Sequence, residues 1–276
     1  MKVQYVTSQN IPLGEQSEYP NKYDPSLLFR IARSESRDSL ISSALPFDGC
    51  DIWNAWELTW LGPNNLPIVA TAEFRIPANT PYLIESKSLK LYLSSFSMSQ
   101  FDSRASVEAA ITNVLAAAAG GPVGVRVEPI EDTEARPVSR LPGECLDTLA
   151  VECSHWEVDA ALLRIESENI VSEELYSHLL RSLCPVTSQP DIGSLAIHYQ
   201  GPKIDRNSLL QYIVSFREHN DFHEACIERM FIDLQQRCKP QKLSLYARYQ
   251  RRGGIDINPF RSNFEDSPRN LRLWRQ

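Results

Sequence analysis

The chain has 276 residues, of which 42% are hydrophobic and 23% charged, and its formal net charge is −7. This composition suits a globular protein of one large domain or two ordinary ones, and it excludes a disordered polymer. The charge is unevenly spread, because residues 128–174 hold 13 acidic side chains and three arginines, whereas residues 247–276 hold seven arginines and three acids. The bulk charge disfavours RNA as a partner but does not exclude a small anionic ligand.

Several classes of protein are excluded by what the sequence lacks. No apolar run approaches the roughly 20 residues that span a bilayer, and the first 16 residues contain no apolar core of a signal peptide. We therefore expect a cytoplasmic protein with no membrane partner. The six cysteines form no CxxC pair, so we expect no metal site. The glycine pairs at 120–121 and 253–254 match neither a Rossmann motif nor a P-loop.

The first half of the chain predicts two strands, two helices and a further strand. Alternating apolar residues indicate strands at 52–61 and 68–76, joined by a Gly-Pro-Asn-Asn turn. Apolar residues at helical spacing predict helices at 88–96 and 106–119, the second ended by Gly120-Gly121. A short strand follows at 124–129.

The second half predicts a similar order after the acidic, weakly patterned stretch 128–174. A strand is expected at 194–200, then helices at 205–216 and 221–238, then a strand at 243–251. We read each half as strand, strand, helix, helix and strand, which predicts an α+β fold with helices packed on one face of an antiparallel sheet.

A repeated pattern supports two related modules. Ser-Leu-x-x-Tyr-x-x-Ser-Phe occurs at 88–96 and again at 208–216, a constant offset of 120 residues. More loosely, Asp51-Ile52 precedes Gly62-Pro63 much as Asp191-Ile192 precedes Gly201-Pro202, and we predict that a strand ends at each Gly-Pro. The order and spacing favour a duplicated module. The predicted division is an N-terminal module at 1–127, an acidic connector at 128–174 and a C-terminal module at 175–276.

One candidate catalytic segment contains Cys184, with Asp191 seven residues later and two prolines between them that stiffen the loop. A thiolate is a strong nucleophile, and a nearby proton acceptor helps to form it. On spacing alone, a half-buried structural cysteine and a turn aspartate are the favoured explanation of the pattern.

A second candidate segment is Asp221-Phe-His223-Glu224, which begins a predicted helix. His223 is a candidate acid or base, and Glu224 a candidate hydrogen-bond acceptor. The alternative is a capping box, since Asp221 and Glu224 have its spacing, and His223 would then face solvent. Cys226 and Cys238 on the same helix are interpreted as core or surface residues.

Two further segments carry cations suited to phosphate. Residues 83–90 place Lys87 and several serines at a predicted helix N-terminus, where free backbone N–H groups also favour anions. Residues 248–254 place arginines beside a glycine pair. The alternatives are capping by Ser86 or Ser88, and arginines that only keep a strand end soluble.

Four segments occur in a fixed order from about residue 20 to the C-terminus: ESKSLKLY at 85–92, CPVTSQPDIGS at 184–194, FHEACIER at 222–229 and YQRRGGIDINPFRS at 249–262. In order and spacing they resemble the long, two-module form of the QueF nitrile reductases. This resemblance implies two tandem tunnelling-fold modules, a fold shared with GTP cyclohydrolase I, in which modules associate into barrels. A homodimer or higher homo-oligomer is therefore expected. Ile192 stands where many relatives carry an aromatic residue, which leaves the packing there open.

The resemblance also implies an activity and a cofactor. Members of this family reduce 7-cyano-7-deazaguanine to 7-aminomethyl-7-deazaguanine with two NADPH per substrate, on the route to the tRNA nucleoside queuosine. The partner would be this small deazapurine, with no direct nucleic-acid contact and no metal.

The roles implied for individual residues follow the family motifs. Cys184 would attack the nitrile carbon to give a covalent thioimide, and Asp191 would donate the proton, with His223 a second candidate. The substrate would be held by Ile84, Glu85, Ser86, His223 and Glu224. The NADPH would be contacted by Ser86, Lys87, Arg252 and Gly253.

Two other functions remain as alternatives. A tunnelling-fold purine hydrolase would need zinc ligands, and the cysteines and histidines are not arranged to supply them. A non-enzymatic purine- or RNA-binding module would use the arginine-rich tail, and its affinity would fall steeply with salt.

Overall fold

The computed structural model describes residues 4–5, 19–41, 44–131 and 137–276. The chain divides into two compact units, each made of several segments. Unit 1 comprises residues 1–38, 51–137 and 251–256, and unit 2 comprises residues 39–50, 138–250 and 257–276. In the described part of the chain, no helix has the length and apolar character needed to cross a membrane.

Unit 1 contains the three strands and two helices predicted for the first half, and further elements that were not predicted. Its elements are β1 (Gln4–Tyr5), a 3₁₀ turn (Pro25–Leu27), β2 (Phe29–Ala32), α1 (Ser34–Arg37), most of β3 (Asp48–Leu61), β4 (Pro67–Pro77), β5 (Tyr82–Ile84), α2 (Ser86–Ser94), α3 (Arg104–Ala119) and β6 (Gly124–Pro129). The predicted ones are β3, β4, β6, α2 and α3.

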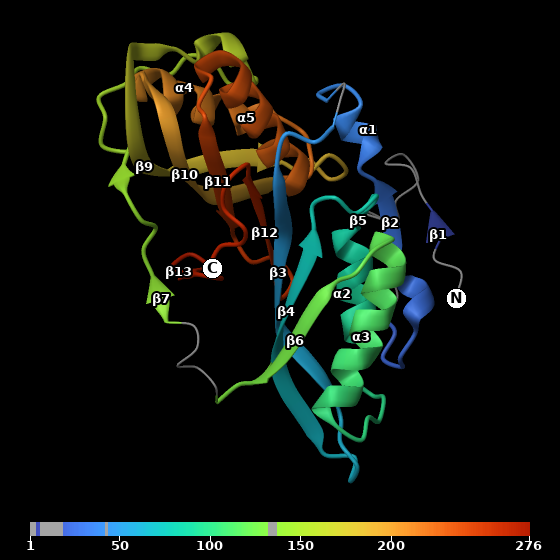
Figure 1. Ribbon diagram of the computed structural model, residues 1–276. Coiled ribbons are helices and arrows are strands. Elements are labelled where there is room, and N and C mark those ends of the chain that lie inside the picture. The colour runs from blue at the N-terminus through green and yellow to red at the C-terminus, as the bar shows by residue number, and fades with distance from the viewer. Residues whose placement is uncertain (1–3, 6–18, 42–43, 132–136) are drawn as a thin grey trace. The chain divides into compact units, whose positions relative to one another are not determined.

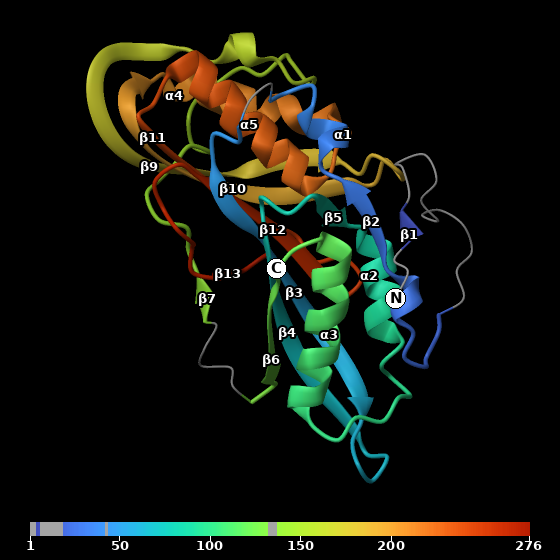
Figure 2. The same ribbon diagram turned by 45° about the vertical axis from the view of Figure 1, so that its right-hand side comes forward.

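The sheet of unit 1 has the strand order β6-β4-β3, and β4 and β6 pair antiparallel. Helices α2 and α3 lie along one face of it (Figures 1 and 2). The predicted turn joins β3 to β4, with the Gly62 N–H donating to the Leu66 carbonyl at 2.9 Å. Asn65 there has a φ of 58°, which asparagine tolerates better than most residues. Gly120 ends α3 in the left-handed conformation, as predicted.

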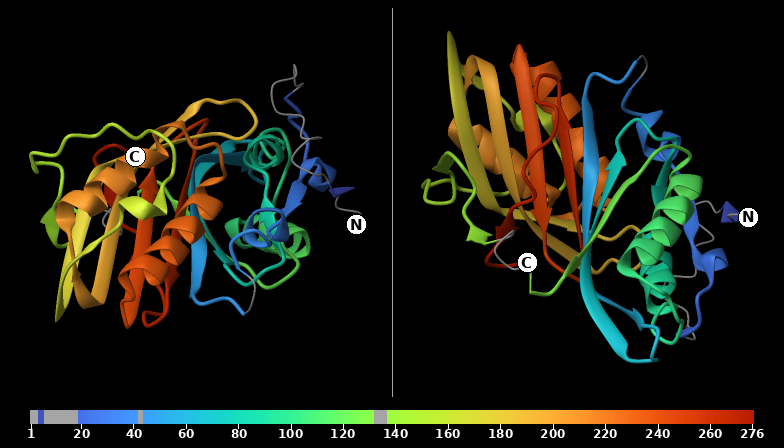
Figure 3. Two further views of the ribbon diagram at one scale, coloured as in Figure 1. Left: turned by 90° about the horizontal axis from the view of Figure 1, so that it is seen from above. Right: turned by 60° about the horizontal axis from the view of Figure 1, so that its bottom comes forward.

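Unit 2 contains a longer sheet and the second pair of helices. Its elements are β7 (Val138–Ser139), β8 (Glu144–Cys145), a 3₁₀ turn (Ala160–Leu162), β9 (Ile165–Leu183), β10 (Pro190–Ile204), α4 (Arg206–Ser215), a 3₁₀ turn (Phe216–Glu218), α5 (His223–Cys238), β11 (Lys242–Tyr249), most of β12 (Ile255–Ser262) and β13 (Arg272–Leu273). The order is β12-β11-β10-β9-β8, with β9 to β12 antiparallel. Helices α4 and α5 cover one face of this sheet (Figure 3). The expected α+β fold is confirmed.

The repeat in the sequence is also a repeat of side-chain contacts. Ser88 donates to the Glu85 carbonyl at 2.7 Å, and Ser208 donates to the Asp205 carbonyl at 2.8 Å. Each serine oxygen also accepts a backbone N–H from the segment before it, from Phe29 in unit 1 and from Arg164 in unit 2. The tyrosine and phenylalanine pack edge to face in both helices, with ring centroids 5.3 Å and 5.4 Å apart. Helices α2 and α4 are therefore equivalent elements.

Two expectations about strands in the second half are wrong. Residues 165–174 of the predicted connector belong to β9. The side chains of this part of the strand are exposed or half-buried, and for this reason its glutamates resemble those of a polar linker in the sequence. Gly201-Pro202 does not end a strand, because both residues lie within β10, where Gly201 pairs with Val171 and Pro202 with Ile170 of β9.

Strand β12 was not predicted either, although every residue in it is buried. Its sequence mixes apolar residues with Asp256, Asn258 and Arg261, which resembles a polar tail more than a strand. The fold satisfies these groups internally, as it must for buried polar atoms. Arg261, for example, donates to Glu228 Oε1 at 2.7 Å.

Candidate active site

The loop that carries Cys184 connects β9 to β10. Leu183 and Pro190 pair at the end of this hairpin, as do Ser182 and Asp191. Within the loop, the Cys184 N–H donates to the Gln189 carbonyl at 3.0 Å, and its own carbonyl accepts from Ser188 at 2.9 Å. Cys184 is half-buried, whereas Cys226 and Cys238 are buried. The hairpin thus fixes the backbone of Cys184 and leaves this residue half-buried, with Asp191 at the same end of the sheet.

Asp191 lies against His223. The His223 Nε2 is 3.2 Å from Asp191 Oδ2, and the two side chains are only 12% and 5% exposed. The imidazole stacks on the Tyr249 ring, with centroids 3.9 Å apart and the planes inclined by 22°. Tyr249 ends β11 and is fully buried. The ring orientation of His223 is therefore set by a tyrosine from the sheet, and its acid–base nitrogen faces a carboxylate.

The capping-box interpretation of residues 221–224 is wrong. Helix α5 starts at His223 with Phe222 as its N-cap residue, and no side chain makes the cap hydrogen bond. Asp221 lies one position before the cap and accepts from the Phe222 N–H instead. Glu224 is thus not the reciprocal partner of a cap, and it is 4% exposed. His223 is half-buried rather than solvent-facing, because its ring is held against Tyr249.

The other cysteines of α5 are poor nucleophiles. Burial, reinforced by the charge of Asp221, raises the pKa of Cys226 well above its ordinary value. Burial also raises the pKa of Cys238 to about 11. Both remain protonated thiols at neutral pH. Of the two interpretations offered by the sequence, core or surface residues, their burial supports the first. Burial likewise raises the pKa of Tyr249, so this ring next to His223 stays neutral.

Glu85 lies in unit 1, at the junction of β5 and α2. It is 2% exposed, and as the N-cap residue it accepts the Lys87 N–H at 2.8 Å and the Ser88 N–H at 2.7 Å, one on each carboxylate oxygen. Capping by Ser86 or Ser88 is therefore wrong. A carboxylate has about four acceptor positions, so two remain for a ligand. Ile84 precedes it in β5 and is buried.

The predicted cofactor residues Arg252 and Gly253 form the turn between β11 and β12. The Arg252 N–H donates to the Ile255 carbonyl at 2.9 Å, and Gly253 and Gly254 have φ of 59° and 81°. Positive φ at both central residues is typical of a tight hairpin turn and explains the glycine pair. A Cβ on Gly253 would lie 3.1 Å from Lys90 Cδ. The turn therefore packs against the lysine one helical turn beyond Lys87 on α2.

Buried groups of β3 anchor this turn. The Trp56 N–H donates to the Gly254 carbonyl at 2.9 Å. Asp256 accepts from Asn54 Nδ2 at 2.7 Å and from Trp56 Nε1 at 2.6 Å. These bonds fix the position of the glycine pair relative to the sheet of unit 1.

The structure thus gathers the predicted residues into two sets. Unit 2 holds Cys184, Asp191, His223 and Glu224, and unit 1 holds Ile84, Glu85, Ser86, Lys87, Arg252 and Gly253. Sequence reasoning missed Tyr249 and Lys90. The signal for Lys90 was its spacing of three from Lys87, which places both on one side of a helix. Tyr249 gave no local signal, because its stacking partner is 26 residues away in the chain.

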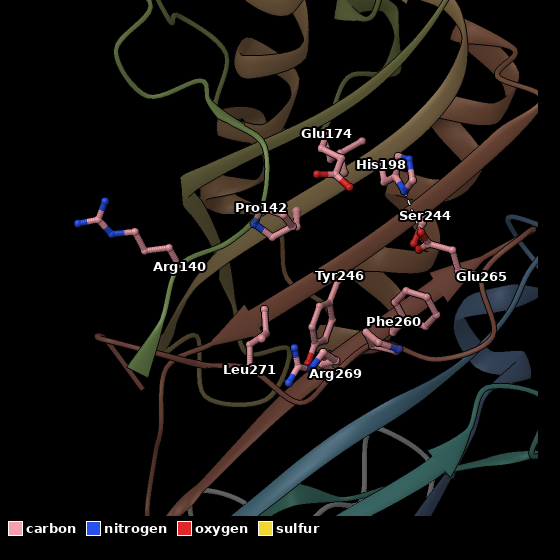
Figure 4. Close-up of a pocket in the computed structure, with 13 residues that line it drawn as sticks. Arg140, Pro142, Glu174, His198, Ser244, Tyr246, Phe260, Glu265, Arg269 and Leu271 are labelled. Atoms are coloured by element: carbon pink, nitrogen blue, oxygen red, sulfur yellow. Dashed lines mark hydrogen bonds and ion pairs between the residues drawn. The ribbon is translucent and has the colours of Figure 1, made fainter. Parts of the chain in front are cut away.

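A separate cavity of about 360 Å³ opens on the sheet of unit 2 (Figure 4). Tyr246 and Phe260 line it, and at its edge His198 Nδ1 lies 2.8 Å from Glu265 Oε1. Of the described residues around it, none is a predicted site residue.

Comparisons with known proteins agree with this arrangement of motifs. The family described as nitrile reductase, 7-cyano-7-deazaguanine-reductase N-term, matches residues 19–127, and the family described as QueF-like protein matches residues 190–268. A curated relative from Azoarcus sp. (strain BH72), named NADPH-dependent 7-cyano-7-deazaguanine reductase, is 54% identical over 92% of this chain and 91% of its own. The chain belongs to the QueF family.

The matched segments contain the candidate residues of both units. The N-terminal QueF match includes the segment 84–87, and the C-terminal match includes Asp191, His223, Glu224, Arg252 and Gly253. Cys184 lies six residues before the second match begins. A solved structure, the archaeosine synthase QueF-Like in the apo form, aligns to 36% of this chain and 98% of its own with 14% identity and a TM-score of 0.30.

Proposed function

We propose that this protein catalyses the NADPH-dependent reduction of 7-cyano-7-deazaguanine to 7-aminomethyl-7-deazaguanine, a step towards queuosine. The observation that carries the proposal is the end of the β9–β10 hairpin, where the half-buried Cys184 is followed by the carboxylate of Asp191, 3.2 Å from the imidazole of His223. The 54% identity to a relative named for this reaction supports it.

Cys184 is the proposed nucleophile. Its sulfur adds to the nitrile carbon, one C–N π bond breaks, and the nitrogen takes a proton, which gives a covalent thioimide. A thioimide accepts hydride far better than a nitrile does, because its carbon is more electrophilic. After the first reduction the sulfur leaves as the thiol, and the substrate retains an imine. The buried cysteines of α5 do not suit this role, because their raised pKa keeps them protonated.

Asp191 and His223 are the proposed proton donors to the substrate nitrogen. Each hydride added to carbon must be matched by a proton on nitrogen, so the site needs groups that are reloaded between the two reductions. A carboxylate and an imidazole in contact can share this task, with the imidazole returning a proton to the carboxylate. Their burial also keeps water away from the imine, which water would hydrolyse.

Glu224 and Glu85 are the proposed acceptors for the donor-rich edge of the deazaguanine. Both carboxylates are nearly fully buried, so their hydrogen bonds to a ligand would form away from water. Losing one acceptor would leave substrate N–H groups unpaired, at about 1–3 kcal/mol each. Ile84, Ser86 and His223 are the other residues proposed to contact the substrate.

The residues proposed to hold NADPH fit its phosphates. Ser86 and Lys87 open α2, while Arg252 and Gly253 form the turn that packs on Lys90, so cations are gathered in unit 1. Bound NADPH supplies hydride, and because a nitrile takes up two hydrides on becoming an amine, two NADPH are consumed per substrate. The role of this chain's residues is to hold the cofactor phosphates beside α2.

The test is a reaction of the purified protein with 7-cyano-7-deazaguanine and NADPH. We expect two NADPH oxidised per amine formed, and a mass increase on Cys184 when the nitrile is supplied without NADPH. Cys184→Ala should lose both the adduct and turnover, while Cys226→Ala, the matched buried control, should still form the adduct. No NADPH oxidation by the wild-type protein, or an adduct that survives Cys184→Ala, would overturn the proposal.

We further propose that the protein works as a homodimer or higher homo-oligomer, because tunnelling-fold modules close into barrels. Light scattering after gel filtration tests this, and a monomer at the concentrations used for assays would contradict it.

A further inference from the structure

The face of the unit 2 sheet opposite α5 carries two arginines in one small cavity. Along β11, alternate side chains point to opposite faces of the sheet. Tyr249 faces α5, where it stacks on His223, so its neighbour Arg248 points to the other face. There Arg248 and Arg275 line a cavity of about 170 Å³.

Arg248 is a buried cation whose hydrogen-bond partners among the described residues are all neutral. It is 2% exposed. Its Nε donates to the Gln276 side-chain oxygen at 2.9 Å, and its Nη1 donates to the Tyr246 hydroxyl at 2.6 Å and the Asn270 side-chain oxygen at 2.8 Å. The guanidinium also lies 5.4 Å from the centroid of the Tyr246 ring. Its Nη2 is enclosed and has no hydrogen-bond partner in the described part of the chain.

Arg275 adds a second cation with neutral partners. Its Nη2 donates to the His178 and Gly193 carbonyls at 2.9 Å and 2.8 Å, and to the Ser194 hydroxyl at 2.9 Å. None of the described side chains lining the cavity is acidic. An arginine stays charged at any physiological pH, and a buried charge without a counter-charge is costly. Arg248 is such a buried charge, and Arg275, which is exposed, adds a second positive charge at the same cavity. The two together favour an anion there.

The remaining lining supplies neutral hydrogen-bond donors. Gln250 and Ser194 line the cavity beside the arginines, and Gln276, which is 8% exposed, fixes its inner wall by donating to the Tyr249 carbonyl and to Asn258 Oδ1, both at 2.9 Å. The cavity is well below the roughly 300–1,000 Å³ of pockets for drug-sized ligands. Its size therefore suits a small oxyanion better than a nucleotide.

We propose that this cavity binds a phosphate-class oxyanion, held by Arg248 and Arg275. Guanidinium groups match the geometry of phosphate oxygens, and such charge-assisted hydrogen bonds are the strong ones. The site is separate from the proposed catalytic residues and does not depend on the proposed function. The anion would be either free phosphate or the phosphoryl end of a larger molecule.

The test is isothermal titration of the full chain with inorganic phosphate, against chloride at the same ionic strength. We expect one saturable site in the wild-type protein and at least a tenfold weaker Kd in Arg275→Gln. Arg237→Gln, an exposed arginine at the end of α5, is the matched control and should bind as the wild type does. Arg248→Met should abolish binding, and if it fails to fold, Arg275→Gln decides alone.

Phosphate could also bind the cations of unit 1, so Arg252→Gln is titrated in parallel. The proposal requires that Arg252→Gln keep the site that Arg275→Gln weakens. The reverse result, or no saturable binding in the wild type, would overturn it. A titration with glycerol 2-phosphate distinguishes the sources: at least tenfold weaker binding than inorganic phosphate assigns a free anion, and equal binding assigns a phosphoryl group.

Discussion

At the scale of single residues, the site depends on groups whose neighbours restrict them. Cys184, Asp191 and His223 carry the proposed chemistry, but the position of the imidazole depends on Tyr249, a fully buried residue on which it stacks. A flat ring held at 3.9 Å leaves His223 few other orientations. Tyr249 is therefore a positioning residue for the proposed proton transfer.

Two substitutions of Tyr249 should distinguish the contribution of its ring to kcat from that of its hydroxyl. Tyr249→Phe keeps the stacking surface, so we expect a kcat close to that of the wild type. Tyr249→Leu removes it, and we expect kcat to fall by about 10- to 100-fold, at most the effect of losing a proton-transfer group. Steady-state kinetics over a range of pH checks this, since a displaced imidazole should also change the pH profile. An unchanged kcat and profile in Tyr249→Leu would show that the stacking does not matter.

Glu85 caps a helix and is also a proposed substrate ligand, and a comparison with Asp205, which only caps a helix, can distinguish these two roles. It caps α2 just as Asp205 caps the equivalent α4, where Asp205 accepts the Ser208 N–H at 2.7 Å. Glu85→Ala and Asp205→Ala should each lower the free energy of unfolding by about 1 kcal/mol, the usual cost of a lost N-cap. Only Glu85→Ala should also raise the KM for the deazaguanine. Denaturant unfolding and kinetics on both variants check this, and an equal KM in the two would remove Glu85 from the substrate site.

At the scale of elements, the proposed cofactor residues depend on a hairpin turn and a helix start. The turn after β11 needs two residues with positive φ, and the helix α2 needs an acceptor at its N-cap. Each requirement is local, and each places a cation or an N–H group in unit 1. The geometry of the turn is therefore part of the proposed cofactor site.

Gly253→Ala tests this dependence. An L-residue in the left-handed conformation costs about 1–2 kcal/mol, and the new Cβ would lie 3.1 Å from Lys90 Cδ. Gly254→Ala is the matched control, since its φ is also positive but its Cβ would meet Glu57 Cγ at an ordinary 3.5 Å. Both variants should lose stability, and Gly253→Ala should raise the KM for NADPH more. Thermal unfolding and initial rates measure the two effects, and the same KM in both variants would argue against a cofactor role for Gly253.

At the scale of the whole molecule, the acidic stretch of the sequence contributes to the fold as well as to the net charge. Glu173 lies in β9, and its carboxylate accepts from the Tyr199 hydroxyl of β10 and from Arg206 at the start of α4, the latter at 2.8 Å. Burial acts to raise the pKa of Glu173, but these hydrogen bonds outweigh burial and the pKa is lowered below its ordinary 4.5. One glutamate of the predicted connector thus joins three elements of unit 2.

A lowered pKa makes this contribution dependent on pH. The ionised carboxylate is favoured in the folded state, so its stabilisation is complete above the ordinary pKa and is lost as the pH falls through the lowered one. Glu173→Gln should therefore be less stable than the wild type at neutral pH and should lose less stability on acidification to about pH 3. Glu168→Gln, at an exposed position of the same strand, should follow the wild-type curve. Thermal unfolding across this pH range measures both, and parallel curves for Glu173→Gln and the wild type would contradict the prediction.

The sequence by itself determined the elements with strong local patterns. Strands β3, β4 and β6 and helices α2 to α5 were predicted within a few residues, because apolar periodicity, the glycine at the end of α3 and the repeated serine motif are all local signals. The candidate catalytic and binding residues came from motif order and resemblance, and their roles remain proposals.

Only the tertiary structure decided which polar residues are buried and what they contact. The sequence of β9 was interpreted as a linker because much of this strand is exposed and polar. Strand β12 was not predicted because its buried Asp256, Asn258 and Arg261 look like the residues of a polar tail, and their partners lie at distant positions in the chain. The capping box at 221–224 had the right spacing, yet α5 starts at His223 and the imidazole is held by Tyr249. Spacing along the chain cannot show such contacts, because they are set by the register between strands and the packing of a helix on a sheet.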